Sequence, residues 1–124
     1  MKRGFLFLIP MLGVSIFPVR APAQGPYGTI AAAPNPCRIE RGQQECTSYI
    51  TWSTQNVAQA KVFVTRENQK GNKEREFGAT LSCESRRCRA PWIQVRTQYV
   101  FKLYDYSSGG RGRLLGSVMV TGER

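Results

Sequence analysis

Few residues of this chain could carry out acid–base or nucleophilic chemistry. Histidine is absent and Asp105 is the only aspartate, which removes Ser-His-Asp and Cys-His catalysis and most zinc sites. A carboxylate pair for glycoside hydrolysis would have to come from the glutamates. Nearly all of these lie beside Lys or Arg in polar segments, as solvated surface acids do; they are Glu40, Glu45, Glu67, Glu74, Glu76, Glu84 and Glu123. We therefore expect no enzymatic activity, no cofactor and no metal.

The four thiols are better suited to disulfides than to chemistry. Cys37, Cys46, Cys83 and Cys88 form an even set, which in a small exported domain indicates two disulfides with three possible pairings. We favour Cys37–Cys46 and Cys83–Cys88, because each pair flanks one short polar loop. Closing such a loop contributes roughly 2–3 kcal/mol in the chain-entropy model. A zinc site is the rival interpretation, but no C-x2-C pair and no histidine accompany these thiols.

The densest local charge is a basic loop that contains Arg86, Arg87 and Arg89. A Cys83–Cys88 disulfide would display the first two outward, and guanidinium groups bind carboxylate, sulfate or phosphate in a bidentate manner. Trp92 could add a stacking face for a sugar. The simpler interpretation is a solvated basic turn with Trp92 in the core. A second basic stretch, for which a solvated surface is again simpler, comprises Lys70, Lys73 and Arg75.

The N-terminal segment has the layout of a secretory signal peptide. Lys2 and Arg3 precede an apolar run over residues 4–17, and Ala21 and Ala23 stand at the spacing of an A-x-A cleavage site. The run is shorter than the roughly 20 residues that a membrane-spanning helix needs. An uncleaved N-terminal anchor is the alternative interpretation.

We thus predict a signal peptide over residues 1–23 and one exported domain over residues 24–124, in the periplasm or outside the cell. The mature domain retains 15 basic and 8 acidic residues, a net charge of +7. Charge of this sign favours anionic polysaccharides or acidic envelope proteins as partners. Nucleic acid does not fit the compartment, and no apolar run in the mature chain is long enough to cross a membrane.

Short segments with period-2 alternation predict an all-β domain. The central one spans residues 99–104, where Tyr99, Phe101 and Leu103 share one face. It follows an approach through Pro91-Trp92-Ile93 and a turn. The expected strands cover residues 28–33, 47–53, 60–66, 76–82, 99–104 and 114–121. The other side chains expected to point inward are Ile50, Trp52, Ala60, Val62, Val64, Leu114, Val118 and Val120.

Three segments resemble a small bacterial immunoglobulin-like or fibronectin type III-like domain. They are GTIAAAPNPC, CTSYITWSTQNVAQAKVFV, and APWIQVRTQYVFKLYD with the closing LLGSVMV. The resemblance implies a sandwich of about seven short antiparallel strands, with Trp52 buried on the second strand. It also implies that Tyr99 is a corner tyrosine, whose hydroxyl bonds to backbone near the preceding turn. Trp52, Trp92, Tyr99 and Phe101 are the expected structural core.

The function that fits these features is an exported, non-enzymatic binding or adaptor module of the cell envelope. Its candidate binding residues are Arg86, Arg87 and Arg89, and its ligand class is an anionic glycan or a protein partner. The alternatives are a structural or assembly protein that pairs through sheet edges, and a small periplasmic inhibitor of a hydrolase. The sequence leaves the ligand and the oligomeric state open.

Overall fold

The computed structural model describes residues 25–67, 71, 73–84 and 86–124, so the expected signal peptide over residues 1–23 lies outside the described part. All regular elements in the described ranges are strands, and no helix there is long and apolar enough to cross a membrane. The eight strands are β1 (Tyr27–Ala33), β2 (Cys37–Arg38), β3 (Glu45–Gln55), β4 (Ala60–Arg66), β5 (Arg75–Gly78), β6 (Arg89–Gln94), β7 (Gln98–Asp105) and β8 (Leu114–Glu123).

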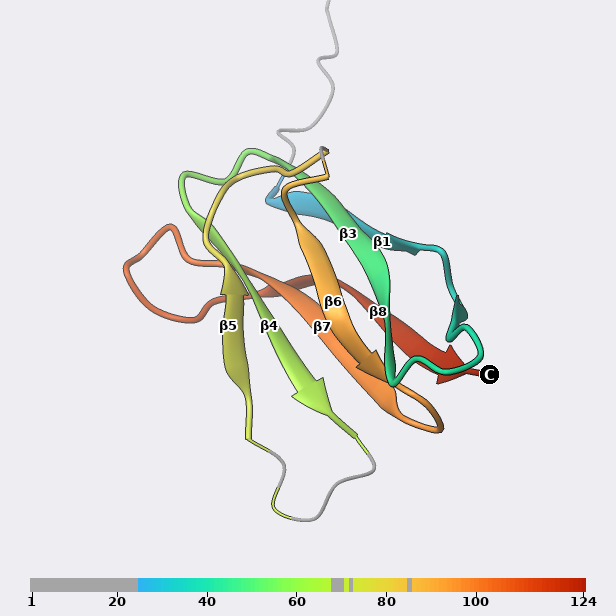
Figure 1. Cartoon of the computed structure of the whole chain (residues 1–124). Helices are drawn as coiled ribbons and strands as arrows, with labels where there is room; N and C mark the ends of the chain where they lie inside the picture. Colours follow the sequence, from blue (N-terminus) through green and yellow to red (C-terminus); the bar gives the residue numbers. More distant parts are fainter. Residues whose placement is uncertain (1–24, 68–70, 72, 85) are drawn as a thin grey trace, which may run out of the picture.

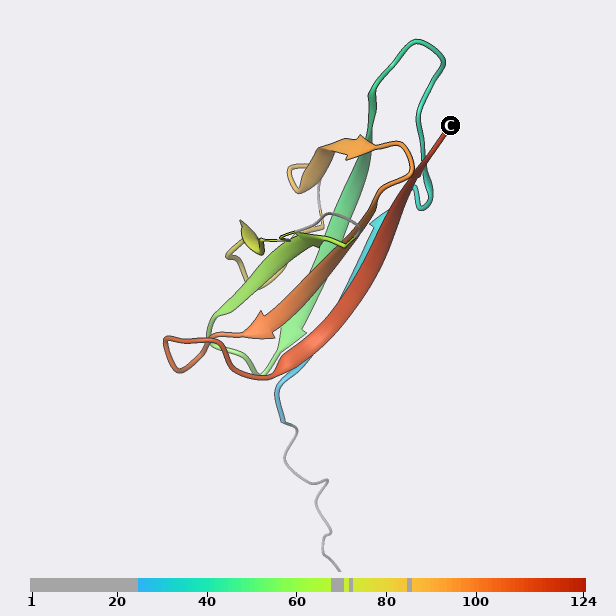
Figure 2. The same ribbon diagram turned by 90° about the horizontal axis from the view of Figure 1, so that it is seen from below.

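The strands form two sheets that pack face to face, as Figures 1 and 2 show. One sheet has the order β1-β3-β6 and the other the order β2-β8-β7-β4-β5. All neighbours are antiparallel except β2 and β8, which are parallel. This confirms the all-β, two-sheet architecture. The alternating segment around residues 99–104 lies at the centre of the larger sheet, as predicted.

Alternation along the central strands fills the space between the sheets. Phe101 and Leu103 of β7 are completely buried, and they stand opposite Val64 and Val62 of β4 in the ladder. Trp52, which is 3% exposed, comes from β3 of the other sheet. Because successive side chains of a strand point to opposite faces, these inward rows meet in one core.

Two strand predictions need correction. The strand expected over residues 76–82 ends at Gly78, because the chain then leaves β4 and follows β3 instead. There the carbonyl oxygen of Thr80 accepts a hydrogen bond from Nε1 of Trp52 at 2.9 Å. The approach through Pro91-Trp92-Ile93 is itself a strand, β6, which pairs with β3. Its irregular register with β3 disguises it in the sequence, because alternation is interrupted.

Leu114 does not point inward as predicted. Its side chain is 47% exposed, and Leu115 packs against the core in its place. The β7–β8 register shifts between Leu103 and Tyr104, so that Gly116 faces Leu103 while Leu114 faces Tyr104. A bulge of this kind inserts one residue and exchanges the two faces of a strand beyond it.

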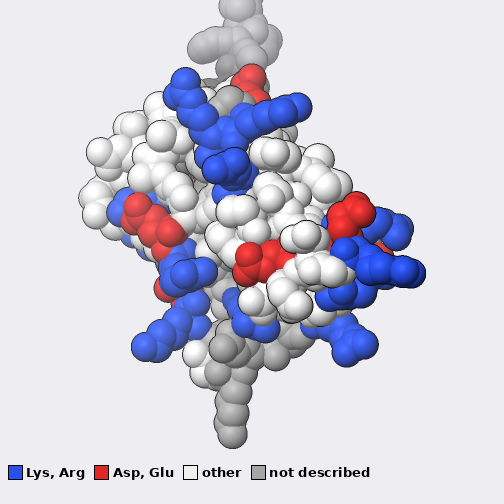
Figure 3. All heavy atoms as spheres, in the orientation of Figure 1, with Lys and Arg blue, Asp and Glu red and all other residues white. Residues whose placement is uncertain are grey.

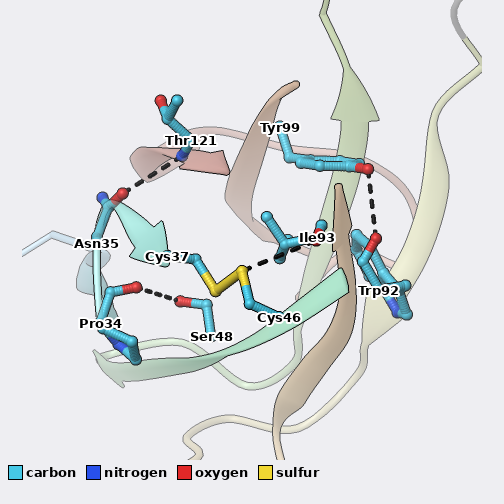
Figure 4. Close-up of a disulfide and its surroundings, with 9 residues drawn as sticks. All are labelled: Pro34, Asn35, Cys37, Cys46, Ser48, Trp92, Ile93, Tyr99 and Thr121. Carbon is cyan, nitrogen blue, oxygen red and sulfur yellow. Dashed lines mark hydrogen bonds between the residues drawn. A yellow bond between two sulfur atoms is a disulfide. The ribbon is translucent and has the colours of Figure 1, made fainter. Parts of the chain in front are cut away.

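The structure pairs Cys37 with Cys46, and this disulfide joins the two sheets (Figure 4). Cys37 belongs to β2 of the larger sheet and Cys46 to β3 of the smaller one. The chain crosses between the sheets after β1, at Pro34 and Pro36, where the missing backbone N–H groups end the ladder. The favoured pairing thus closes a local loop and also fixes the distance between the layers.

Polar side chains hold this crossing to both sheets (Figure 4). Ser48 Oγ of β3 donates a hydrogen bond to the carbonyl oxygen of Pro34 at 3.0 Å. Asn35 Nδ2 donates to the carbonyl oxygen of Met119 at 2.8 Å, and its Oδ1 accepts from the backbone N–H of Thr121 at 3.4 Å. The ladder is interrupted at the prolines, and these side chains provide hydrogen bonds to backbone groups there.

The structure also pairs Cys83 with Cys88, and here the disulfide bridges a detour of the chain. Cys83 exchanges two backbone hydrogen bonds with Trp52, and the carbonyl oxygen of Cys88 accepts one from the backbone N–H of Ile50. Both cysteines therefore continue the ladder of β3 beyond β6. The described residues between them are exposed; they are Glu84, Arg86 and Arg87.

Gly78 gives a test of the core, because its Cα faces the indole ring of Trp52. A Cβ at this position would lie 2.6 Å from Cη2 of Trp52, and that ring is held by its hydrogen bond to Thr80. We predict that Gly78→Ala lowers the free energy of unfolding by about 1–3 kcal/mol, measured by urea denaturation.

Gly110→Ala is the matched control, since a Cβ at Gly110 has nothing within 4 Å. We expect it to change the free energy of unfolding by no more than about 0.5 kcal/mol. Equal stability of the two variants would contradict the packing of Gly78 against Trp52.

Candidate functional site

A cleft opens at one end of the sandwich, between the strands that form the exposed edges of the two sheets. β5 and β6 lie on the same side of the molecule, one from each sheet (Figure 2). The cleft has a volume of about 500 Å3. Its lining residues come from the end of β4, the segment before and at the start of β5, the second half of β6 and β7; they are Val64, Arg66, Gly71, Lys73, Arg75, Trp92, Gln94 and Tyr99. The lining thus contains three cationic side chains and no acid.

Arg66 enters the cleft because it continues an inward-facing row. Ala60, Val62 and Val64 of β4 are buried at every second position, and Arg66 occupies the next one. At this point the row reaches the end of the core. Nε of Arg66 is buried and has no hydrogen-bond partner among the described residues. A buried donor without an acceptor costs about 1–3 kcal/mol in stability. An anion bound in the cleft could supply the missing acceptor and offset this cost.

β5 sorts its charges by alternation. Glu74, just before the strand, and Glu76 point to the outer face of the sheet, whereas Arg75 points to the cleft. On the outer face, Arg111 Nη2 contacts Glu74 Oε1 at 2.5 Å and Lys61 Nζ contacts Glu76 Oε1 at 3.0 Å. The two acids that flank Arg75 in the sequence are therefore engaged by cations on the other side of the sheet.

Aromatic rings fix the floor of the cleft. Trp92 is half-buried, with its ring centroid 5.2 Å from that of Tyr99 and 6.1 Å from that of Phe101, which it stacks against. The hydroxyl of Tyr99 donates a hydrogen bond to the carbonyl oxygen of Trp92 at 3.4 Å (Figure 4). The guanidinium carbon of Arg75 lies 5.7 Å from the Trp92 ring centroid, within the range of a cation–π contact. The indole thus holds an arginine and is not an open platform for a sugar.

None of the three cations of the cleft, Arg66, Lys73 and Arg75, forms an ion pair with a carboxylate of the described chain. Arg75 and Lys73 are exposed at the rim, while Arg66 is half-buried. Three unneutralised positive charges in a concave site raise the local concentration of anions. Two guanidinium groups also provide forked donors that match the oxygens of a carboxylate or sulfate.

The basic loop predicted from the sequence lies outside the cleft. Figure 3 shows Lys and Arg side chains gathered at the top of the molecule, over the connection from β5 to β6. Arg86, Arg87 and Arg89 are all exposed there. Arg86 lies 5.9 Å from the ring centroid of Tyr49, and Arg89 stands opposite Tyr49 in the ladder. This group is therefore separate from the cleft. Arg87 lines a second hollow, whose other lining residues are Thr80, Ser82, Cys83, Glu84 and Cys88.

The outer face of the larger sheet carries aromatic residues that contact one another. The ring of Phe63 lies 6.1 Å from that of Tyr104 and 5.9 Å from that of Tyr106. Arg111 covers this group, with its guanidinium carbon 4.5 Å from Phe63 and 4.3 Å from Tyr104. The hydrogen bond to Glu74 raises the pKa of Arg111 above its ordinary value. Cross-strand ring contacts and the side chain of Arg111 thus occupy this face.

The connection from β7 to β8, which carries Arg111, is held by Asp105. Its Oδ1 accepts hydrogen bonds from the Ser107 hydroxyl at 2.6 Å and from the Ser107 backbone N–H at 2.8 Å. These two bonds lower the pKa of the Asp105 carboxyl below its ordinary value. The only aspartate of the chain is therefore a turn residue and does not face the cleft.

Sequence reasoning missed Arg66 and assigned Arg75 and Lys73 to a solvated surface; Lys70 of the same stretch lies outside the described residues. A signal for Arg66 was present, because it is the fourth member of an alternating row whose other members are apolar. No sequence feature shows that this row and β6 meet at the same end of the sandwich. Within the described ranges, no three His, Cys, Asp or Glu side chains are grouped as metal ligands.

The charge of the cleft can be tested through the fluorescence of Trp92, since Trp52 is 3% exposed and shielded from quenchers. We predict that iodide quenches the accessible tryptophan several-fold more strongly than caesium, because the cations around Trp92 attract the anion. Neutral acrylamide provides the measure of accessibility alone, and added salt should reduce the difference.

Arg66→Ala/Arg75→Ala should bring iodide quenching down toward that of acrylamide. Arg38→Ala/Arg41→Ala removes the same charge from two exposed residues at the other cysteine-closed loop and should leave it unchanged. Equal quenching by iodide and caesium in the wild type would contradict a cationic cleft.

Comparison with known proteins provides no ready assignment for this cleft. No family model, no curated protein and no solved structure matches the chain. What the cleft does must therefore be inferred from its own residues and their geometry.

Proposed function

We propose that the protein is an exported, non-enzymatic binding module of the cell envelope, and that its cleft holds the anionic group of a glycan. The observation that carries this proposal is the convergence of Arg66, Lys73 and Arg75 in a concave site that no acid lines. The basic loop of Arg86, Arg87 and Arg89 is then an accessory surface, and the cleft is the primary site.

The binding mode follows from the placement of the two arginines. Arg75 is oriented by the Trp92 ring, so less side-chain freedom is lost when its fork meets a carboxylate. Arg66 offers a donor that has no other acceptor, and the amide of Gln94 stands at the same wall. Charge-assisted hydrogen bonds of this kind are about twice as strong as neutral ones.

The same geometry argues for binding without a reaction. A general acid or base must lie within hydrogen-bond reach of the substrate group that it serves. Glu74 and Glu76, the carboxylates on either side of Arg75, form ion pairs on the opposite face of the sheet. The chain contains no histidine to take over that role.

An immunoglobulin-like or fibronectin type III-like fold is part of this proposal. It is supported by the division of the strands, since β1, β3 and β6 form one sheet while β4, β7 and β8 belong to the other. Constant-type immunoglobulin sheets divide their strands in the same way, with one exception. Their strand D pairs in the sheet of strands A, B and E, whereas β5 here pairs with β4 in the other sheet. The buried Trp52 on β3 and the Tyr99 hydroxyl bonded to backbone seven residues upstream also support it.

An exported location is supported by the two disulfides, which form and persist in oxidising compartments. The signal-peptide features of residues 1–23 point the same way. Two of the edge strands, β5 and β6, are less suited to the alternative of assembly by strand addition. β6 carries Pro91 and β5 has only four residues, both of which are devices that discourage edge pairing.

The test is the binding of digalacturonate, with neutral digalactose as the matched ligand, followed by Trp92 fluorescence or calorimetry. We expect digalacturonate to bind and digalactose not to bind, with affinity falling as salt is added. Arg66→Ala/Arg75→Ala should weaken binding at least about tenfold, because each lost hydrogen bond to a charged group contributes about 1.5–3 kcal/mol.

Arg75→Lys keeps the charge but loses the fork, and we expect an intermediate loss. Arg38→Ala/Arg41→Ala is the control for net charge and should bind like the wild type. Equal affinity for both sugars, or full binding by the Arg66→Ala/Arg75→Ala variant with its fold intact, would disprove the proposed function.

A further inference from the structure

We infer that the ligand is a linear anionic polysaccharide that runs along β6, from the cleft to the Cys83–Cys88 loop. This inference rests on the proposed function and specifies its ligand as a polymer. Basic groups lie at the two ends of one edge strand, β6.

β6 connects the two basic groups directly. Its second half, with Trp92 and Gln94, lines the cleft, and Arg89 is its first residue. Arg86 and Arg87 lie in the loop that immediately precedes β6. Six residues of strand span about 17 Å at about 3.3 Å per residue, so a single small anion in the cleft cannot reach the loop, whereas a chain of several sugars can.

β6 itself carries no acidic residue. β6 is the last strand of its sheet, so one of its edges has no strand beside it, and its sequence RAPWIQ contains no Asp or Glu. Glu45 stands opposite Gln94 on the paired side, on β3, and not on the free edge. Glu84 is the one described acid at the loop and is exposed there. Arg86, Arg87 and Arg89 outnumber it.

The base of the Cys83–Cys88 loop is held by covalent and backbone contacts. The Cys83–Cys88 disulfide closes it, and backbone hydrogen bonds from Cys83 to Trp52 and from Ile50 to Cys88 fix its base on β3. The guanidinium of Arg86 also rests near the Tyr49 ring. These contacts restrict Arg86 before binding, so less side-chain freedom is lost when its guanidinium meets a ligand.

The same contacts favour a polysaccharide over a single-stranded nucleic acid. Nucleic acids of that kind bind by stacking bases on open aromatic faces. Along this path, Trp92 has Arg75 over its ring and Tyr49 has Arg86 over its ring. The surface therefore offers charge at intervals, as a polyuronate requires, and no free stacking platform.

The test measures affinity against the chain length of oligogalacturonates, from the monomer to the octamer, at constant salt. We expect affinity per molecule to rise steeply once the chain is long enough for both sites, at about four to six sugars, with the octamer at least about tenfold tighter than the dimer. Arg86→Ala/Arg87→Ala should abolish this rise and leave dimer binding unchanged. Both residues are exposed, so the variant should fold normally.

The outcomes separate this inference from the proposed function. If the dimer binds and the octamer binds no tighter, or if Arg86→Ala/Arg87→Ala leaves the octamer affinity unchanged, the polymer path is wrong while the cleft remains. If neither the dimer nor the octamer binds, the proposed function itself has failed. An oligothymidylate of similar charge that binds more tightly than the octamer would also overturn the inference. Arg38→Ala/Arg41→Ala again controls for the loss of net charge.

Discussion

Contact between aromatic rings across the two sheets is the interaction on which this molecule depends. Phe101 of β7 lies 5.1 Å from Phe77 of β5 and 6.1 Å from Trp92 of β6, so one ring joins three strands from both layers. Trp52 adds an edge-to-face contact with Phe77 at 6.2 Å. Such pairs contribute about 0.5–1.5 kcal/mol beyond the area that they bury. They also position Trp92, and with it the floor of the cleft.

The cleft arises where the inward rows of this sandwich extend past its core. Arg66 and Arg75 occupy positions that alternation directs toward the space between the sheets, but they lie where that space opens to solvent. A charged side chain deeper in the row would have to be desolvated without a partner, at a cost of several kcal/mol. At the open end Arg75 is exposed, and Arg66 is half-buried with its Nε covered and without a partner. The alternation that directs apolar side chains into the core thus also places Arg66 and Arg75 at its open end.

Alternation and local cysteine spacing allow much of the fold to be predicted from the sequence. They give β4 and β7 nearly residue by residue, and the pairing of each cysteine with its nearest neighbour. They fail where tertiary contacts override the pattern. Leu114 is exposed because of a bulge, and the segment after Gly78 leaves its sheet to bond with Trp52. The cleft was missed because Arg66 and Arg75 meet only through the register of β4 with β5, which the sequence does not reveal.

The two disulfides both join neighbouring cysteines but stabilise different parts of the fold. Cys37–Cys46 joins the sheets beside completely buried residues such as Ile93 and serves the core. Cys83–Cys88 instead closes a loop that leaves the edge of β3 after Cys83 and returns at Cys88. Without this closure, we expect the backbone hydrogen bonds of both cysteines to β3 to be weakened. A protein that needed only stability could omit the detour and let β6 continue along β3. Retaining it makes physical sense if the residues that it projects, Arg86 and Arg87, contact something outside the chain.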